Sequence, residues 1–342
     1  MKIGLSYDLK DSITPHLSPL PQREEEKERE QPEDALEEYD SVETVDALKA
    51  AIEAKGHTVV KLGGGREFLK KVLTEKVDFV FNISEGLGSY RSREAQAPSI
   101  LEMLDIPYSG ADPQCLAICL DKNLTKKLVA WEGVPTPRWQ VIDSSNVKSI
   151  DWAALPSPAF VKPVWEGSSK GIRLNSLVRD PAQMQSIVTQ LLKQYRQPVL
   201  VEEFIAGEEV TVGIVGNSPA QVVGIMRVVP RQKEGDFVYS LEVKRNYEKL
   251  VDYECPAQLD KTVLKNIEKY ALKAFQILEC RDFSRVDFRI SPDGTPYFLE
   301  INPLAGLNPR TSDLIIMARL AGWTYNRLIG TILEAALKRN PQ

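Results

Sequence analysis

Two carboxylates and an amide stand close together in the stretch SRVDFRISPDGTPYFLEINPLAG. Because side chains alternate along a strand, Arg285 and Asp287 project to one face, and Glu300 and Asn302 share a face of the next strand. The Asp-Gly turn between the strands predicts a hairpin that brings Asp287, Glu300 and Asn302 together. Such an all-oxygen set suits Mg²⁺, and Arg285 beside it could stabilise negative charge on a reacting centre. The apolar neighbours of Glu300 and Asn302 favour a buried site over an exposed hairpin with solvated charges.

A second stretch, FVKPVWEGSSKGI, is typical of a phosphate-binding loop. A strand delivers Lys162 and then breaks into residues 166–171, where two glycines bracket two serines. This composition lets backbone N–H groups approach phosphate oxygens closely. A Gly/Ser loop alone is a weak signal. The lysine before it and the carboxylates downstream of it together indicate a nucleotide-triphosphate site.

A third stretch, VLVEEFIAGEEVTVGI, contains four glutamates. Glu202 and Glu209 end successive strand-like runs, and Glu203 follows the first of them. One carboxylate could accept a hydrogen bond from an adenine amine and the other from ribose hydroxyls. The same pattern is more often a solvated turn, so the glutamates alone leave both interpretations open.

Composition excludes several other kinds of chemistry. The 342 residues include only two histidines, His16 and His57, so Ser-His-Asp catalysis or a histidine metal site has little to work with. The net charge of −5 argues against a general nucleic-acid binder, which needs basic residues to neutralise phosphates. Nine acidic and three basic side chains lie in residues 19–38, so this segment carries −6 and the remainder +1.

Cysteine usage and hydropathy indicate a reducing compartment. The four cysteines, at positions 115, 119, 255 and 280, lack the spacing of a zinc site and are expected to be buried free thiols. The start, MKIGLSYDLK, lacks the features of a signal peptide, and no uncharged apolar run approaches the ~20 residues of a membrane span. We therefore expect a cytoplasmic protein that binds no membrane.

The elements that must position these residues alternate in type. Strands are predicted over residues 2–7, 57–62 and 77–83, with helices between them. Asp40 or Ser41 caps the first of these helices. The alternation of strand and helix predicts a parallel sheet. One long helix is predicted from about Pro113 to Trp131.

The chain is therefore predicted to be α/β with α+β subdomains. We expect an N-terminal α/β lobe (1–112), a central subdomain (113–218) and a C-terminal subdomain (219–342). Residues 11–38 are proline-punctuated and charge-dense, so they are expected to form a solvated, mobile insertion. The long polar stretch 231–257 is expected to be a mobile loop that closes over the site.

Several motifs taken together resemble the ATP-grasp superfamily, and most closely its D-alanine–D-alanine ligase-like family. The similarity runs from about Val77 to the end of the chain, roughly three quarters of it, through IPYSG, LDKNLTKKL, GVPTP, VKPVWEGSSKG, VEEFIAGEEVTV, ECPA and RVDFRI…FLEINPLAG. The resemblance implies an ATP-grasp fold. It also implies an enzyme that phosphorylates a carboxylate with ATP, couples the acyl phosphate to an amine, and forms a homodimer.

The resemblance assigns most of these residues to ATP. It implies nucleotide contacts from Lys122, Lys162, Glu166, Gly167, Ser168, Ser169, Glu202, Glu203, Glu209 and Lys244. In this assignment Lys122 and Lys162 contact phosphates, and Lys244 reaches the γ-phosphate from the mobile loop.

The remaining residues are assigned to the metal and the reaction. Asp287, Glu300 and Asn302 would bind two Mg²⁺ ions, with Mn²⁺ as an alternative metal. Arg285 and the backbone of Gly306 would stabilise the oxyanion, and Ser168 would help to hold the first amino acid.

The chain departs from the family in the parts that bind the first D-alanine. Ser84-Glu85-Gly86 and residues 90–94 replace the family's His-Gly and Gly-Glu-Asp-Gly elements, and Arg245 replaces a tyrosine. Candidate substrate-binding residues are Glu85, Arg91, Arg93, Arg245 and Thr311. One hypothesis is that an arginine among them reads an additional substrate carboxylate, and the alternative is that these arginines form surface ion pairs.

The leading interpretation is an ATP-dependent carboxylate–amine ligase that joins two amino-acid-like or peptide substrates and is not strictly specific for D-alanine. A genuine D-alanine–D-alanine ligase of cell-wall synthesis is one alternative. A catalytically idle, nucleotide-binding regulatory protein is another.

Overall fold

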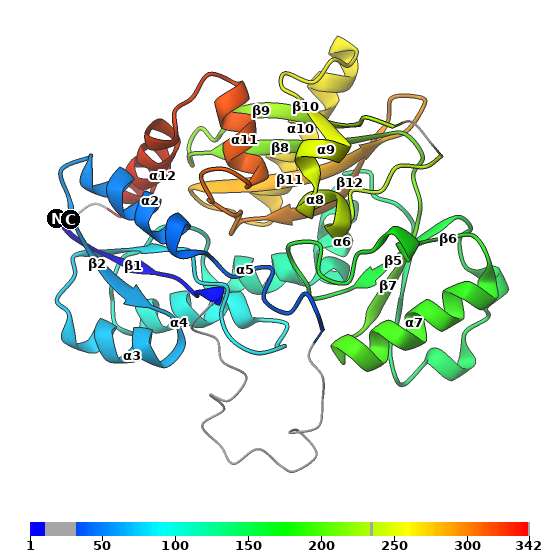
Figure 1. The fold of residues 1–342 in the computed structure, drawn as a ribbon, viewed down its shortest axis with the longest axis horizontal. Helices are drawn as coiled ribbons and strands as arrows, with labels where there is room; N and C mark the ends of the chain where they lie inside the picture. The colour runs from blue at the N-terminus through cyan, green and yellow to red at the C-terminus, as the bar shows by residue number, and fades with distance from the viewer. Residues whose placement is uncertain (11–31, 233–234, 341–342) are drawn as a thin grey trace.

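The computed structural model describes residues 1–10, 32–232 and 235–340 (Figure 1). Its N-terminal sheet has the order β2-β1-β3, and all three strands are parallel. The strands are β1 (Lys2–Ser6), β2 (Thr58–Gly63) and β3 (Phe79–Asn82). The helices are α2 (Val42–Glu53), α3 (Gly65–Thr74) and α4 (Gln96–Met103). The predicted N-terminal lobe with a parallel sheet is confirmed.

A four-stranded antiparallel sheet of order β4-β7-β5-β6 forms the middle of the chain. Its strands are β4 (Trp139–Ile142), β5 (Ala159–Pro163), β6 (Leu177–Val178) and β7 (Val199–Glu203). Helix α7 (Pro181–Tyr195) contributes Met184, Val188 and Leu191 to the core of this sheet.

A five-stranded antiparallel sheet of order β10-β9-β8-β11-β12 forms the C-terminal part. Its strands are β8 (Glu208–Val215), β9 (Gln221–Pro230), β10 (Val251–Glu254), β11 (Phe283–Ile290) and β12 (Pro296–Asn302). The helices after β10 are α10 (Lys261–Ile277), α11 (Asp313–Leu320) and α12 (Tyr325–Arg339). Strand β8 lies before the predicted boundary at residue 218, yet it pairs with β9 and β11 of this sheet.

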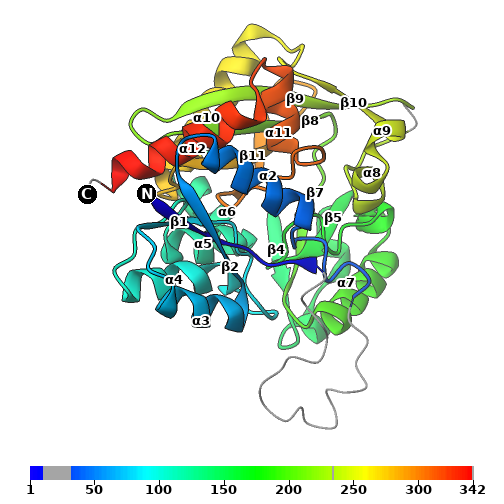
Figure 2. The same ribbon diagram turned by 60° about the vertical axis from the view of Figure 1, so that its left-hand side comes forward.

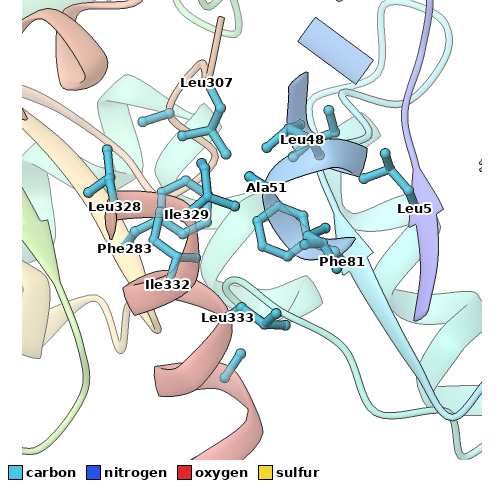
Figure 3. Packing of buried hydrophobic residues seen from close by; sticks show 14 of the residues in the cluster. Leu5, Leu48, Ala51, Phe81, Phe283, Leu307, Leu328, Ile329, Ile332 and Leu333 are labelled. Atoms are coloured by element: carbon cyan, nitrogen blue, oxygen red, sulfur yellow. The ribbon is translucent and has the colours of Figure 1, made fainter. Parts of the chain in front are cut away.

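One hydrophobic core joins the first and last parts of the chain (Figure 3). Leu5 and Leu48 of the N-terminal lobe belong to the same buried cluster as Phe283, Leu328 and Leu333. Figure 2 shows α2 lying along the C-terminal helices, close to β1. The N-terminal lobe is therefore fixed against the C-terminal sheet rather than tethered to it by a linker.

The helix predicted over residues 113–131 is two helices, α5 (Pro113–Leu120) and α6 (Lys122–Trp131). Asp121 has extended backbone angles, and its carboxylate accepts hydrogen bonds from the N–H groups of Asn123 and Leu124 at 3.1 Å. An aspartate in this arrangement caps a new helix. The break places Lys122 at the first helical position of α6, with its side chain buried.

The acidic segment is partly ordered, contrary to expectation. Residues 11–31 lie outside the described residues, but residues 32–38 are docked between the N-terminal lobe and the central sheet. Asp34 is fully buried and Glu38 is 8% exposed. The prediction of a solvated segment is therefore wrong for these residues, because buried cations compensate their charge.

The long polar stretch 231–257 contains regular structure rather than a plain loop. It forms the short helices α8 (Leu241–Arg245) and α9 (Tyr247–Leu250) and then β10. All four cysteines are free, as predicted, but only those at 115, 119 and 280 are buried; Cys255 is half-buried, so the expectation of a buried thiol is wrong there. Within the described parts of the chain, no helix has the length and apolar character needed to cross a bilayer.

Candidate active site

The hairpin of β11 and β12 brings the predicted metal-binding residues together. In its register Asp287 stands opposite Glu300, and Arg285 stands opposite Asn302. Arg285 Nη2 lies 2.8 Å from Asp287 Oδ2 and 3.9 Å from Glu300 Oε1. From the neighbouring strand β8, the Thr211 hydroxyl donates to Asp287 Oδ1 at 2.6 Å. The predicted juxtaposition is confirmed, and Arg285 contacts both carboxylates.

Glu300 stays ionised in this setting. Burial alone would raise the pKa of Glu300. Four nearby cations outweigh burial and lower the pKa to about 2: Lys122, Lys162, Arg285 and Lys244. Lys122 Nζ lies 3.3 Å from Glu300 Oε2. An ionised carboxylate opposite a second carboxylate and beside an amide offers the hard oxygen ligands that Mg²⁺ prefers. The donor set therefore fits the metal that the resemblance implies.

Glu202 joins two lysines at the inner end of the site. Its carboxylate oxygens lie 2.7 Å from Lys162 Nζ on β5 and 2.9 Å from Lys126 Nζ on α6. Burial lowers the pKa of Lys126 to about 8 even though Glu202 opposes the shift. Sequence reasoning missed Lys126, although its spacing of four residues from Lys122 places both lysines on one helix face.

Two further glutamates of the predicted nucleotide set, Glu209 and Glu203, contact arginines. Glu209 Oε2 lies 3.2 Å from Arg289 Nη1, and Arg289 Nε donates to the carbonyl of Ile205 at 2.6 Å. Burial raises the pKa of Glu209. Glu203 is more exposed and pairs with Arg138 at 3.0 Å.

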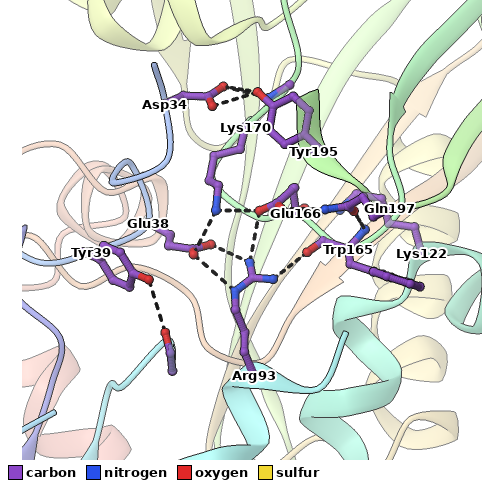
Figure 4. A network of polar contacts seen from close by, with 12 residues as sticks. Asp34, Glu38, Tyr39, Arg93, Lys122, Trp165, Glu166, Lys170, Tyr195 and Gln197 are labelled. Carbon is purple, nitrogen blue, oxygen red and sulfur yellow. Dashed lines mark hydrogen bonds and ion pairs between the residues drawn. The ribbon is translucent and has the colours of Figure 1, made fainter. Parts of the chain in front are cut away.

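A buried network of charges holds the loop 166–171 (Figure 4). Arg93, at the start of the 3₁₀ helix Arg93–Ala95, donates to Glu38 Oε2 at 2.6 Å, to Glu166 Oε2 at 3.3 Å and to the carbonyl of Trp165 at 2.7 Å. Lys170 pairs with both carboxylates, at 2.9 Å from Glu38 Oε1. Glu38 therefore connects the ordered end of the acidic segment to the phosphate loop.

The serines of this loop adopt backbone angles that are uncommon for residues other than glycine. Ser168 and Ser169 have φ values of 49° and 60°. Lys122 Nζ donates to the backbone carbonyl of Glu166, which ties the loop to the lysine beside Glu300. The loop lies between two cavities, because Gly167 and Ser168 line one of them and Ser169 lines the other.

The first cavity is a cleft of about 780 Å³ between the central and C-terminal sheets. Its lining includes the predicted nucleotide and metal residues Lys162, Ser169, Glu202, Glu203, Glu209, Lys244, Asp287 and Glu300. The cleft thus brings together residues from both sheets that the sequence predicted for ATP and metal.

The second cavity, of about 1,490 Å³, lies between the N-terminal lobe and the C-terminal subdomain. Arg285, Asn302, Gly306 and Thr311 line it. Tyr239, Lys244 and Asp313 line both cavities. A ligand in the cleft and a ligand in the large cavity would therefore meet beside Lys244 and the β11–β12 hairpin.

Asp313 is a residue of this junction that sequence reasoning missed. It lies 3.6 Å from Arg285 Nη1 and accepts a hydrogen bond from the Tyr239 hydroxyl at 3.1 Å. It begins α11, seven residues beyond the NPLAG motif, so no short motif indicated it.

None of the three arginines predicted to bind a substrate carboxylate is an unpaired side chain in a cavity. Arg93 is 1% exposed and its guanidinium is directed at Glu38 and Glu166, so neither the substrate role nor a surface ion pair describes it. Arg91 is exposed and lines neither cavity. Arg245 lines the large cavity but pairs with Glu33 and Glu37 of the acidic segment, at 2.5 and 2.6 Å.

Comparisons with known proteins agree with this geometry. A family model described as the C-terminus of D-ala D-ala ligase matches residues 128–334. The D-alanine–D-alanine ligase of Aquifex aeolicus is 33% identical over 294 residues, which cover 86% of this chain and 94% of that protein. An uncharacterized protein of Sinorhizobium fredii, y4sG, is 31% identical over 303 residues, or 86% and 87% of the two chains.

Solved structures show the same fold. The D-alanine–D-alanine ligase from Bacillus anthracis complexed with ATP superimposes with a TM-score of 0.73 at 23% identity, over 99% of this chain and 98% of that one. The VanG D-Ala:D-Ser ligase from Enterococcus faecalis has a TM-score of 0.70 at 21% identity, over 98% and 99%. The chain has the ATP-grasp fold and belongs to the D-alanine–D-alanine ligase family of ligases that form C–N bonds.

Proposed function

We propose that this protein is an ATP-dependent carboxylate–amine ligase that joins two amino-acid-like substrates and is not restricted to D-alanine. The observation that carries the proposal is the junction of the two cavities. The cleft and the larger cavity, which is lined by Arg285 and Gly306, have Lys244 and Asp313 in their shared wall. ATP in the cleft and a carboxylate in the cavity would thus be adjacent.

The residues of the cleft would bind and orient ATP. Lys122, Lys162 and Lys244 would supply positive charge for the phosphates, and Glu202 and Glu209 would hold the nucleoside. Asp287, Glu300 and Asn302 would hold Mg²⁺, which shields phosphate charge and stabilises the transferring phosphoryl group.

The residues of the large cavity would serve the two chemical steps. A substrate carboxylate oxygen attacks the γ-phosphorus, ADP leaves, and an acyl phosphate forms. The amine of the second substrate then attacks the acyl carbon, phosphate leaves, and the amine loses a proton. Arg285 and the N–H of Gly306 would stabilise the oxyanion of the second step, and Ser168 would help to position the first substrate.

Relaxed specificity follows from the wall of the N-terminal lobe. Glu85, Glu94 and Arg245 line the large cavity where the family's elements for the first D-alanine are replaced. The relatives named D-alanine–D-alanine ligase support a two-amino-acid reaction, and the D-Ala:D-Ser ligase neighbour supports a fold that accepts a different second substrate.

ADP release tests the proposal. Mg-ATP is incubated with pairs of D- and L-amino acids and dipeptides, and ADP and the coupled product are measured. We expect turnover with pairs other than two D-alanines, its loss in Glu300→Gln, and its retention in Glu268→Gln, a matched change on the exposed face of α10. Turnover confined to two D-alanines would make the protein a strict D-alanine–D-alanine ligase. Binding of Mg-ATP without ADP release from any pair would favour the idle, regulatory alternative.

A further inference from the structure

Two carboxylates in the wall of the large cavity have no partner in the described chain. Glu85 follows β3 and Glu94 lies on the 3₁₀ helix Arg93–Ala95, and both line the cavity. Glu94 is 5% exposed. Within residues 1–10, 32–232 and 235–340, neither carboxylate accepts a hydrogen bond or forms an ion pair. Glu94 is thus a buried acid and Glu85 a half-buried one, and both line the large cavity without a hydrogen-bond or ion-pair partner among the described residues.

This arrangement is unfavourable for the protein alone. Burial raises the pKa of Glu94 to about 7, and burial together with Glu94 raises the pKa of Glu85 well above its usual range. A buried carboxylate is normally paired or hydrogen-bonded, and an unpaired one in a cleft indicates a site that a ligand completes. The group that would complete two adjacent carboxylates is a cation.

The protein's own nearby cations are already engaged. Arg93 is bound by Glu38 and Glu166, and Arg245 is bound by Glu33 and Glu37. The acidic segment therefore neutralises the two arginines that could otherwise attract a substrate carboxylate. At the N-terminal end of the cavity Glu85 and Glu94 therefore keep no ion-pair partner among the described residues, and a bound ammonium group would favour their ionised forms.

The cavity is consequently polarised. Its C-terminal side presents Arg285 and Lys244 beside the reaction centre, and its N-terminal side presents Glu85 and Glu94. A substrate with its carboxylate at Arg285 and an ammonium group at the opposite wall would match both ends. The lining of the cavity runs from Glu85 and Glu94 at one end to Arg285 and Asn302 at the other, and this extent accommodates a substrate longer than alanine.

We propose that Glu85 and Glu94 form an ammonium-binding end of the large cavity, which receives a cationic amine held several bonds away from the reacting carboxylate of the substrate. The inference rests on the proposed ligase function for the identity of that carboxylate. Two kinds of substrate carry this chemistry: an amino acid with a side-chain amine, and a short peptide with a free N-terminus.

Calorimetric titration of the full-length protein with Mg-ADP present tests the site without turnover. The first pair of probes is D-lysine and its neutral analogue D-norleucine. The second pair is glycyl-D-alanine and its N-acetylated form. We expect the cationic member of at least one pair to bind roughly tenfold more tightly or better, as charged hydrogen bonds allow. The pair that shows the preference identifies the source of the ammonium.

The double variant Glu85→Gln, Glu94→Gln should reduce that preference to less than threefold. Both carboxyl groups protonate readily, so the amides resemble the neutral acids and the fold should be retained. The Kd of Mg-ADP should accordingly stay within twofold of that of the unmodified protein. Glu53→Gln, a matched change on the exposed face of α2, should keep the full preference. Equal binding within both pairs, or a preference that survives the double variant, would overturn the inference.

ADP release measured in parallel separates this inference from the ligase proposal. Turnover with two D-alanines but no preference for a cationic probe would remove the ammonium site and leave the ligase proposal intact. Preferential binding of a cationic probe with no turnover from any pair would leave the ammonium site and remove the ligase proposal.

Discussion

Replacing Glu38 with glutamine removes the carboxylate at the centre of the buried network below the phosphate loop. Glu38 makes two contacts with Arg93, at 2.6 and 3.2 Å, and one with Lys170 at 2.9 Å, and its side chain is 2% exposed. The intact network balances two cations with Glu38 and Glu166. The substitution leaves one positive charge buried without a counter-ion.

The expected cost is large because the group is buried. Breaking a buried ion pair by removing one partner costs about 3–5 kcal/mol, a substantial part of a typical unfolding free energy of about 5–15 kcal/mol. Lys170 and Glu166 belong to the loop 166–171, so the KM for ATP should also rise. Burial alone would raise the pKa of Glu38, but Arg93 and Lys170 hold this pKa below its usual range. The stabilisation is therefore present above about pH 4.5 and is lost as the pH falls through the folded-state pKa.

Urea denaturation followed by tryptophan fluorescence measures the effect. The matched control is Glu33→Gln, because Glu33 also pairs with arginines but is 68% exposed, so solvent screening should leave the unfolding free energy nearly unchanged. The double variant Glu38→Gln, Arg93→Met restores the charge balance and should be less destabilised than the sum of its single changes. A loss of under about 1 kcal/mol in Glu38→Gln, equal to that of the control, would refute the assignment of a structural role to this network.

Four further changes test other parts of the structure. Arg285→Met should lower kcat by roughly 10²–10³-fold; because the change also breaks a buried ion pair, kcat is measured under conditions where circular dichroism shows the variant to be folded, and a kcat within threefold of the original would exclude the oxyanion role. Asp121→Ala should lower the unfolding free energy by about 1 kcal/mol, through loss of the α6 cap, and should raise the KM for ATP. An unchanged KM would contradict the idea that this cap positions Lys122 for ATP. Gly64→Ala should cost about 1–3 kcal/mol, since its Cβ would lie 1.8 Å from Asp8 Oδ1, and an unchanged denaturation midpoint would contradict that packing. Burial raises the pKa of Asp40 to about 7, so the folded state loses stability as the pH rises towards 7. Asp40→Asn should therefore stabilise the protein more at pH 8 than at pH 5, and the reverse order would contradict a raised pKa at Asp40.

The β11–β12 hairpin was predictable because its geometry is local. The Asp-Gly turn and the alternation of side chains are enough to place Asp287 opposite Glu300, and the structure has that register. Likewise, strand and helix alternation predicted the parallel sheet of the N-terminal lobe. Short-range pattern and turn chemistry carry this information without any knowledge of tertiary contacts.

The features that the sequence did not reveal depend on contacts between distant residues. The carboxylate of Glu38 meets Arg93, 55 positions along the chain, and Lys170, 132 positions along it. Composition alone made that segment look solvated, because its charges have no neutralising partners nearby in the sequence. The end of α5 at Asp121 was missed for a related reason: an aspartate inside an apolar helical pattern signals a cap only when its backbone is seen to be extended.

The core that joins Leu5 and Leu48 to Leu328 and Leu333 has a consequence for how the protein is made. During synthesis β1 and α2 leave the ribosome first, whereas the helix that covers them, α12, is among the last elements added. The apolar face of the N-terminal lobe must therefore stay exposed until translation is almost complete, an interval in which a chaperone could bind it. Release of a nascent chain before α12 would leave a lobe with an intact parallel sheet and an uncovered face, prone to aggregate rather than to function.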